Sequence, residues 1–397
     1  MTVSARVQDV FAGGLRPVPE RDVRIVRVAR LPAEAPDAGA RIAAAMGSDL
    51  AQIFVFASPR ADFAALSAAL GAACGDIPVA ACTTAGEIDH GFRTDAIVAL
   101  GLPAAEFRTQ TVLVDDLSRI DTDAVVADMI RARRSLDPVQ ASMPYEFAFL
   151  LVDGTSQRED DLMDAISHGL GPVPLFGGSA GDGTDFRLSL LSLNGTVMTG
   201  AAVLVFARSA CPVRVFSFDH LEPGETRMVV TAAEPARRRV TEINAAPAAP
   251  EYARILGKDP DDLDGFTFAA HPLVVRVGGR YFVRSIQRVG ADRDLFFFSA
   301  IDEGVVLTLA DTRDIAGALS ESLGEIAGAG EIDTVLACDC ILRRIEAQQK
   351  QRTGAVSEVL ARHNVVGFST YGEQFGAMHV NLTMTGIAIF RPPTEET

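Results

Sequence analysis

Residues 172–183, PVPLFGGSAGDG, place Ser179 in the spacing G-x-S-x-G at the end of an apolar run. In α/β-hydrolases this spacing forms the nucleophile elbow, a tight strand-to-helix turn whose serine attacks an acyl group. Such a turn requires a helix directly after the serine, whereas DGTDFRLSLLSLNG carries turn signals and then a strand-like run. We therefore expect Ser179 not to be a nucleophile, and a serine hydrolase is the least favoured hypothesis.

Two further segments, TTAGE (83–87) and STYGE (369–373), share the hydroxyl, glycine and acidic residue of GSAGD (178–182). Glycine allows a positive φ and a close backbone approach. A Ser or Thr hydroxyl can satisfy backbone groups at a strand end, and an acid can accept from N–H groups or from a ligand. A structural turn and a pocket built from paired turns both remain open. The candidate ligand-binding residues in these segments are Thr84, Glu87, Ser179, Asp182, Thr370, Tyr371 and Glu373.

Each turn follows a strand, a helix and a second strand, so the chain contains an internal repeat. A β-α-β unit of this length implies parallel strands, and open α/β sheets usually bind ligands at the carboxyl ends of such strands. Ser156 and Glu159 form an S-x-x-E capping box that predicts the start of the second helix. The expected strands are 53–58, 77–82, 147–152, 173–177, 334–338 and 364–368, and the expected helices are 61–73, about 156–170 and about 341–361.

The segment MHVNLTMT (378–385) alternates polar and apolar residues, which predicts one strand with His379 and Asn381 on its polar face. That face meets either water or a cavity. We predict a common cavity that contains Tyr371, Glu373, His379 and Asn381 together with Cys340 or Arg343. In this arrangement Glu373 supplies the counter-charge of Arg343.

Composition limits the classes of partner. The formal charge of −16 argues against unaided binding to nucleic acid or to an anionic membrane. No signal peptide or membrane-spanning run is apparent, so we expect a cytoplasmic protein. The five cysteines form no disulfide framework, and the C-x-C pair at Cys338 and Cys340 lacks a second pair, so no metal is predicted.

LFGGSAGDG (175–183) resembles the signature of the FIST N-terminal domain. CILRR (340–344) and FSTYGEQFGAMHVNLTMTGIAIF (368–390) resemble the FIST C-terminal domain, and the resemblance spans about residues 23–390. It implies an α/β fold with repeated β-α-β units in two mixed-sheet domains, FIST N (23–215) and FIST C (216–392). It also implies a sensory protein of signal transduction that binds a small ligand. No kinase, cyclase or DNA-binding motif is found, so we expect it to act through a separate partner.

Some bacterial FIST proteins are haem-based sensors of nitric oxide that regulate a histidine kinase or a cyclic-di-nucleotide enzyme. The resemblance therefore raises haem as an alternative ligand. No C-x-x-C-H motif is present, so haem would be held non-covalently. His379 is then the first candidate for its axial ligand.

Overall fold

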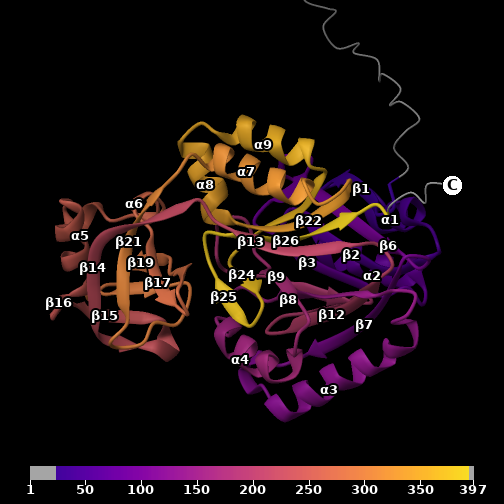
Figure 1. The fold of residues 1–397 in the computed structure, drawn as a ribbon, viewed down its shortest axis with the longest axis horizontal. Helices are drawn as coiled ribbons and strands as arrows, with labels where there is room; N and C mark the ends of the chain where they lie inside the picture. Colours follow the sequence, from indigo (N-terminus) through magenta and orange to yellow (C-terminus); the bar gives the residue numbers. More distant parts are fainter. Residues whose placement is uncertain (1–23, 393–397) are drawn as a thin grey trace, which may run out of the picture.

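The computed structural model describes residues 24–392; residue 23, where the expected FIST N domain begins, lies outside this range. Three six-stranded mixed sheets form one part of the molecule, which we call the three-sheet body. An eight-stranded sheet with two helices forms a second part beside it (Figure 1), the β-rich module of residues 221–312. This arrangement confirms the α/β class with repeated β-α-β units, whereas the predicted domain boundary at 215/216 stays a prediction.

The first sheet contains the first repeat and carries its two helices, α1 (Ala38–Met46) and α2 (Phe63–Cys74), on one face. Its strands, in spatial order, are β1 (Arg27–Pro32), β6 (Ala96–Pro103), β2 (Leu50–Ala57), β3 (Val79–Thr83), β10 (Leu191–Leu193) and β11 (Thr196–Met198).

The second sheet contains the second repeat and packs against α3 (Thr122–Ser135) and α4 (Glu159–Leu170). Its strands, in spatial order, are β25 (Met378–Val380), β24 (Glu373–Phe375), β9 (Leu175–Ser179), β8 (Tyr145–Val152), β12 (Ala202–Ser209) and β7 (Phe107–Val114).

The third sheet contains the third repeat and is covered by α7 (Ile315–Ala327), α8 (Ile341–Gln349) and α9 (Thr353–Arg362). Its strands, in spatial order, are β13 (Val213–Phe218), β26 (Met384–Phe390), β22 (Ile332–Cys340), β23 (Val365–Thr370), β4 (Glu87–Asp89) and β5 (Phe92–Arg93).

The predicted repeat is confirmed by strand pairing. In each unit the two strands that flank the helical segment pair in parallel: β2 with β3, β8 with β9, and β22 with β23. Each of the three turns lies at or directly beyond the carboxyl end of the second strand. The repeat therefore brings the same turn to the same place in each sheet.

Three local predictions were wrong. The helix expected over 341–361 is split into α8 and α9 because Gln351 adopts a left-handed φ of 54°. The strand expected over 378–385 is also interrupted, because Leu382 has a φ of 51°, so β25 and β26 belong to different sheets. The capping box is not formed, because α4 begins at Glu159 and Ser156 Oγ donates to the carbonyl of Asp153 at 2.6 Å.

The hairpin after each turn extends the sheet of another repeat. The hairpin β4–β5 joins the third sheet, β10–β11 joins the first, and β24–β25 joins the second. Each hairpin thereby covers a strand edge that would otherwise expose unpaired backbone groups. The three repeats are closed into a ring by this exchange, and their inner faces share one core.

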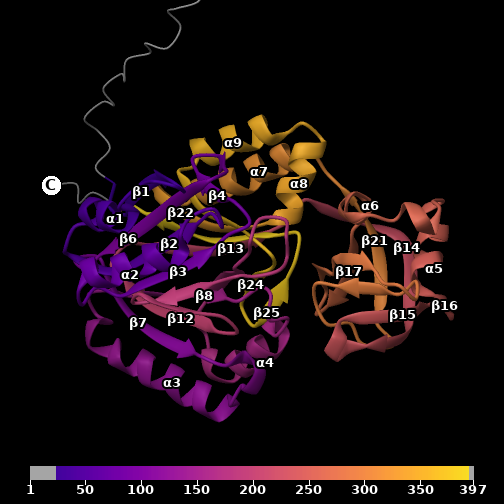
Figure 2. The ribbon, with the colours of Figure 1, turned by 180° about the vertical axis from the view of Figure 1, so that it is seen from behind.

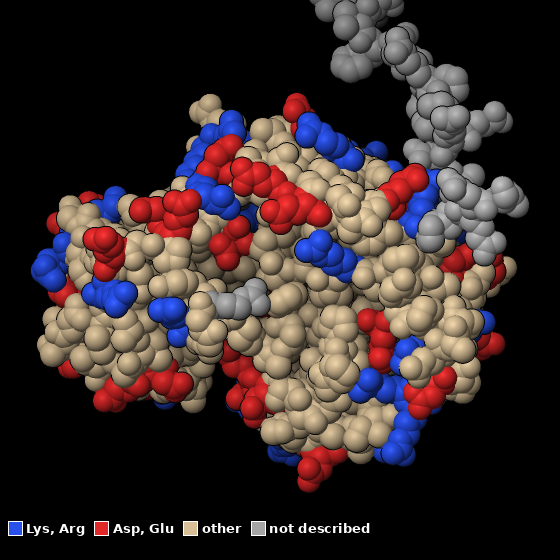
Figure 3. Space-filling model, in the orientation of Figure 1, with Lys and Arg blue, Asp and Glu red and all other residues tan. Residues whose placement is uncertain are grey.

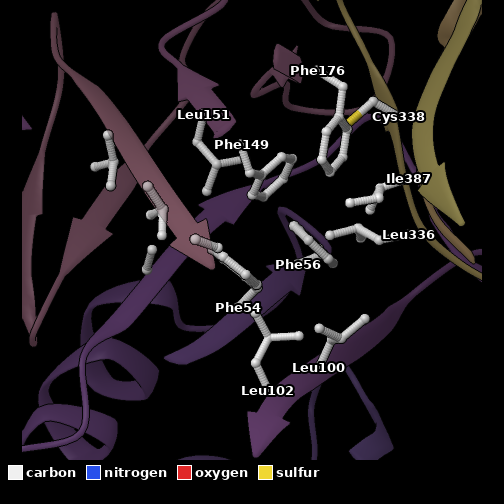
Figure 4. Packing of buried hydrophobic residues seen from close by; sticks show 14 of the residues in the cluster. Phe54, Phe56, Leu100, Leu102, Phe149, Leu151, Phe176, Leu336, Cys338 and Ile387 are labelled. Atoms are coloured by element: carbon white, nitrogen blue, oxygen red, sulfur yellow. The ribbon is translucent and has the colours of Figure 1, made fainter. Parts of the chain in front are cut away.

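That shared core consists of aromatic and aliphatic side chains from all three sheets (Figure 4). Phe56 of β2 stacks on Phe368 of β23 with ring centroids 4.5 Å apart. The ring centroid of Phe149 of β8 lies 4.9 Å from that of Phe54 and 4.8 Å from that of Phe176. Because the outer helices and the inner core cover both faces of each sheet, central strands such as β2, β6 and β8 are near-continuous apolar runs.

The β-rich module is inserted in the chain between β13 and α7, ahead of the third repeat. It is joined to the body by two chain segments, from β13 into β14 (Leu221–Glu234) and from β21 (Val306–Thr312) into α7. Its other elements are β15 (Arg239–Ile243), β16 (Ala246–Pro247), α5 (Ala248–Leu256), α6 (Gly265–Ala270), β17 (Leu273–Val277), β18 (Arg280–Val283), β19 (Ile286–Val289) and β20 (Leu295–Phe297). A separate buried cluster around Tyr252 forms its core.

Candidate functional site

The three repeated turns meet one another. We call residues 83–87, 178–182 and 369–373 turns 1, 2 and 3. Backbone hydrogen bonds join every pair of turns, so the turns form one continuous structure. These bonds are Ala85 N–H to Ser369 O at 2.9 Å, Ser369 N–H to Gly86 O at 2.6 Å, Ser179 N–H to Gly372 O at 2.8 Å, and Gly181 N–H to Thr83 O at 3.1 Å.

In turns 1 and 3 the hydroxyl and the acid bond to each other. Thr84 Oγ1 donates to Glu87 Oε1 at 2.6 Å, and Thr370 Oγ1 donates to Glu373 Oε1 at 2.5 Å. Both glutamates are fully buried, and this desolvation raises the pKa of Glu87 to about 7 and that of Glu373 to about 8. Thr383 Oγ1 also donates to Glu373, at 2.9 Å. These carboxyl groups therefore have protein partners inside the turns.

In turn 2 the acidic residue, Asp182, accepts hydrogen bonds from outside the turn rather than from a hydroxyl of the same turn. Tyr371, from turn 3, donates its hydroxyl to Asp182, and the N–H of Leu188 donates to Asp182 at 2.8 Å. Partial burial opposes ionisation of Asp182, but these hydrogen bonds hold its pKa below the ordinary value. The same contacts position Phe186, whose ring stacks on Tyr371 with centroids 4.3 Å apart. Turns 2 and 3 together thus present an aromatic pair.

This aromatic pair faces a cleft between the three-sheet body and the β-rich module. The cleft consists of two adjoining pockets of about 590 and 120 Å³, which share six lining residues. The shared residues are Gln157, Phe186, Arg238, Gln287, Phe297 and Phe298. Tyr371 lines the smaller, inner pocket, whereas Leu342 and Ile345 of α8 line the larger, outer pocket. Figure 2 shows α8 at the junction of the two parts.

Arg238 of the module and Glu159 of the body form an ion pair at the base of the cleft. Arg238 Nη2 lies 2.6 Å from Glu159 Oε2 and 3.3 Å from Asp160 Oδ2, and its Nη1 donates to Phe298 O at 2.5 Å. Both Arg238 and Glu159 are buried. The cleft therefore has a fixed polar floor that neither the motifs nor the predicted helix cap revealed.

Ser179 lies behind this floor and is fully buried. Its Oγ donates to Glu159 Oε1 at 3.4 Å and accepts from Gln374 Nε2 at 3.1 Å. The same Gln374 nitrogen lies 3.4 Å from His379 Nδ1, so the amide stands between the serine and the histidine. No helix begins at Ser179, and the geometry does not support a nucleophile elbow.

We predict that Ser179→Ala leaves hydrolysis of a p-nitrophenyl ester and labelling by a fluorophosphonate probe at wild-type levels. The reason is that the hydroxyl is fully buried, out of reach of a substrate, and that the carboxylate it contacts, Glu159, is already ion-paired with Arg238. Loss of either signal in this variant would contradict the prediction.

His379 and Asn381 are both buried, so a solvated face over 378–385 is excluded. A Cβ built on Gly372 would lie 2.3 Å from His379 Cε1 and 3.2 Å from Asn381 Nδ2, which places both side chains against turn 3. Neither polar atom of the Asn381 side chain has a hydrogen-bond partner among the described residues. Burial lowers the pKa of His379, which favours the neutral imidazole.

Haem with His379 as axial ligand does not fit this geometry. An axial histidine must present a ring nitrogen to the face of a large planar group, whereas His379 is packed against Gly372 and Gln374. Neither pocket of the cleft includes a histidine among its lining residues. Between residues 24 and 392, no group of three or more His, Cys, Asp or Glu side chains is arranged to hold a metal ion.

Arg343 does not pair with Glu373. Its Nε donates to Asp339 at 2.7 Å, and its Nη1 lies 2.8 Å from His220 Nδ1. Arg344 is the arginine that reaches turn 1, where its Nη1 lies 3.5 Å from Glu87 O. Cys340 is buried in the apolar cluster that includes Tyr371.

The structure thus brings Tyr371 to the cleft and leaves most of the predicted residues in the layer behind it. The cleft residues that sequence reasoning missed come mainly from the module, above all Arg238, Gln287, Arg288 and Phe298. The run LFFFSA (295–300) contained one signal for these residues, because three consecutive phenylalanines of a strand cannot all face one core.

The fold and the cleft define a two-part α/β protein with an open cleft between its parts. The FIST N domain matches residues 51–246 and the FIST C domain matches residues 248–376. The chain therefore belongs to the FIST family, whose domains are sensory domains associated with signal transduction. A comparison with curated proteins found no match. None of the helices between residues 24 and 392 is long and apolar enough to cross a membrane.

Proposed function

We propose that this protein is a small-ligand sensor whose ligand binds in the cleft between the three-sheet body and the β-rich module. The observation that carries this proposal is the position of Tyr371. A residue of the repeated turns, at the carboxyl edge of the sheets, lines a pocket that the module closes from the other side. Concave, mostly apolar sites between domains with a few fixed polar groups are typical of small-molecule sites.

Helix α8 supplies the route by which the cleft can influence the position of the module. Leu342 and Ile345 line the cleft. Two other residues of the helix, and the residue directly after it, contact the two segments that join the module to the body. Arg343 and Glu346 contact His220 on the first segment, at 2.8 and 2.7 Å. Lys350, directly after the helix, donates to Thr312 on the second segment at 2.6 Å. A ligand that presses on Leu342 and Ile345 therefore acts on a helix that contacts one connection directly and the other through the residue that follows it.

Occupation of the cleft is proposed to change the angle between module and body, and a separate partner reads this change. A histidine kinase or a cyclic-di-nucleotide enzyme is the kind of partner that the family resemblance implies. A cytoplasmic location follows from the same proposal, because both kinds of partner act on signals inside the cell.

Gln287→Tyr tests the site, since Gln287 lines both pockets and a larger side chain there would fill their junction. The protein is incubated with a small-molecule extract, separated from unbound compounds and analysed by native mass spectrometry. We expect a retained compound in the wild type and at least about tenfold less in Gln287→Tyr. Val229→Tyr, at an exposed position of the module that does not line the cleft, should retain it fully. Equal retention by all three proteins would place the ligand elsewhere and overturn the proposal.

A further inference from the structure

The larger pocket of the cleft has basic but no acidic residues in its lining, although the protein as a whole is strongly acidic. Its lining includes Arg237, Arg238 and Arg288 and contains no aspartate or glutamate. The whole chain has 52 acidic and 36 basic residues, and both signs are mixed over the surface in Figure 3. An acid-free lining with three arginines is therefore a local departure from the composition of the chain.

The three arginines differ in how far their charge is already paired. Arg238 is held by Glu159 and Asp160, and Arg237 lies 3.3 Å from Glu234 at an exposed position. Arg288 forms no ion pair with any residue that the structure describes; its guanidinium instead lies over the ring of Phe296, 3.7 Å from the centroid. Stacking on a ring fixes the plane of the guanidinium and leaves its N–H groups free to donate.

Aromatic and aliphatic side chains form the rest of the lining. Phe186 and Phe298 lie at the inner end with ring centroids 5.8 Å apart, and Phe266 is 58 % exposed at the outer end. Leu342 and Ile345 of α8 line the same pocket. Together these side chains give the pocket the mostly apolar lining that is typical of small-molecule sites and that an aromatic ring can contact.

We infer that the cleft recognises a small aromatic molecule with a single anionic group, of the aromatic carboxylate class. The carboxylate binds Arg288 and the ring lies among the phenylalanines. This inference rests on the proposed function and names the class of ligand. A free amino acid fits less well, because its ammonium group needs an available carboxylate. Glu159, the acid in the inner pocket, is already paired with Arg238.

The chain contains no tryptophan, so the fluorescence of an indole compound can be followed without background from tryptophan of the protein. We choose indole-3-acetate as the anion, indole-3-acetamide as its neutral counterpart and tryptophan as the zwitterion. Fluorescence anisotropy of each compound is measured against increasing protein. We expect indole-3-acetate to bind at least about tenfold more tightly than the other two.

Arg288→Gln is expected to weaken binding of indole-3-acetate by about 10- to 100-fold and to leave indole-3-acetamide within about threefold. The matched control is Arg276→Gln, because Arg276 also lies over an aromatic ring, that of Tyr281 at 5.9 Å, but lines a different pocket. It should bind all three compounds as the wild type does.

Equal binding of the anion and the amide, tighter binding of tryptophan, or an unchanged affinity in Arg288→Gln would each overturn the anion inference. Absence of binding by indole-3-acetate would also overturn it. None of these results decides the proposed function, which fails instead if Gln287→Tyr retains the extracted ligand. The two proposals are thus tested by different variants and different probes.

Discussion

Arg343→Leu is expected to lower the free energy of unfolding by on the order of 3–5 kcal/mol. Arg343 is almost fully buried, and its removal would leave the buried carboxylate of Asp339 without a counter-charge. It would also remove the contact with His220, which lies where the chain enters the module. Equilibrium denaturation followed by circular dichroism measures the loss. Small-angle scattering on the folded variant reports whether the angle between module and body becomes more variable.

Two variants distinguish charge pairing from packing at Arg343. The double variant Asp339→Asn with Arg343→Leu removes both charges and should recover a large part of the lost stability. Arg352→Leu removes an exposed pair with Asp314, 2.7 Å apart, and should cost less than about 1 kcal/mol. A loss in Arg343→Leu as small as that in Arg352→Leu would contradict the prediction.

Glu373→Gln should change how stability depends on pH. Burial raises the pKa of Glu373 from 4.5 to about 8, so the folded protein holds this proton more tightly than the unfolded chain. The free energy of unfolding of the wild type therefore falls as pH rises from about 4.5 to about 8. The loss from this residue is on the order of 4 kcal/mol. Glutamine stays neutral and can accept from Thr383 while donating to Thr370, so the variant should lack this loss.

The measurement is chemical denaturation at several pH values between 5 and 8, with the difference between variant and wild type as the readout. This difference cancels the contributions of the buried histidines. Glu251→Gln is the control. A hydrogen bond from Arg254 lowers the pKa of Glu251 to about 2, so the effect of its protonation on stability falls below the measured pH range. Parallel curves for wild type and Glu373→Gln would show that Glu373 is ionised in the folded state.

The sequence by itself determined the repeat, the parallel pairing inside each unit and the position of the turns. These features are local: an apolar run, a helix-forming segment and a second run cannot bury their faces in many other ways. The turn motif also identified residues that are truly buried and bonded, such as Thr370 and Glu373. The resemblance carried by the same residues gave the family.

The tertiary structure alone decided which residues line the cleft. The hairpin exchange turned the predicted pocket residues into the contact layer between three sheets, because pairing across repeats depends on strand edges far apart in the chain. Arg343 pairs with Asp339, four residues earlier, and contacts His220 where the chain enters the module, so it is not the partner of Glu373. The cleft lies between residues of the module and Tyr371 of turn 3. Its lining comes from segments more than 80 residues apart in the sequence, such as those of Phe186, Arg288 and Tyr371. No local sequence pattern indicates that such distant segments come together.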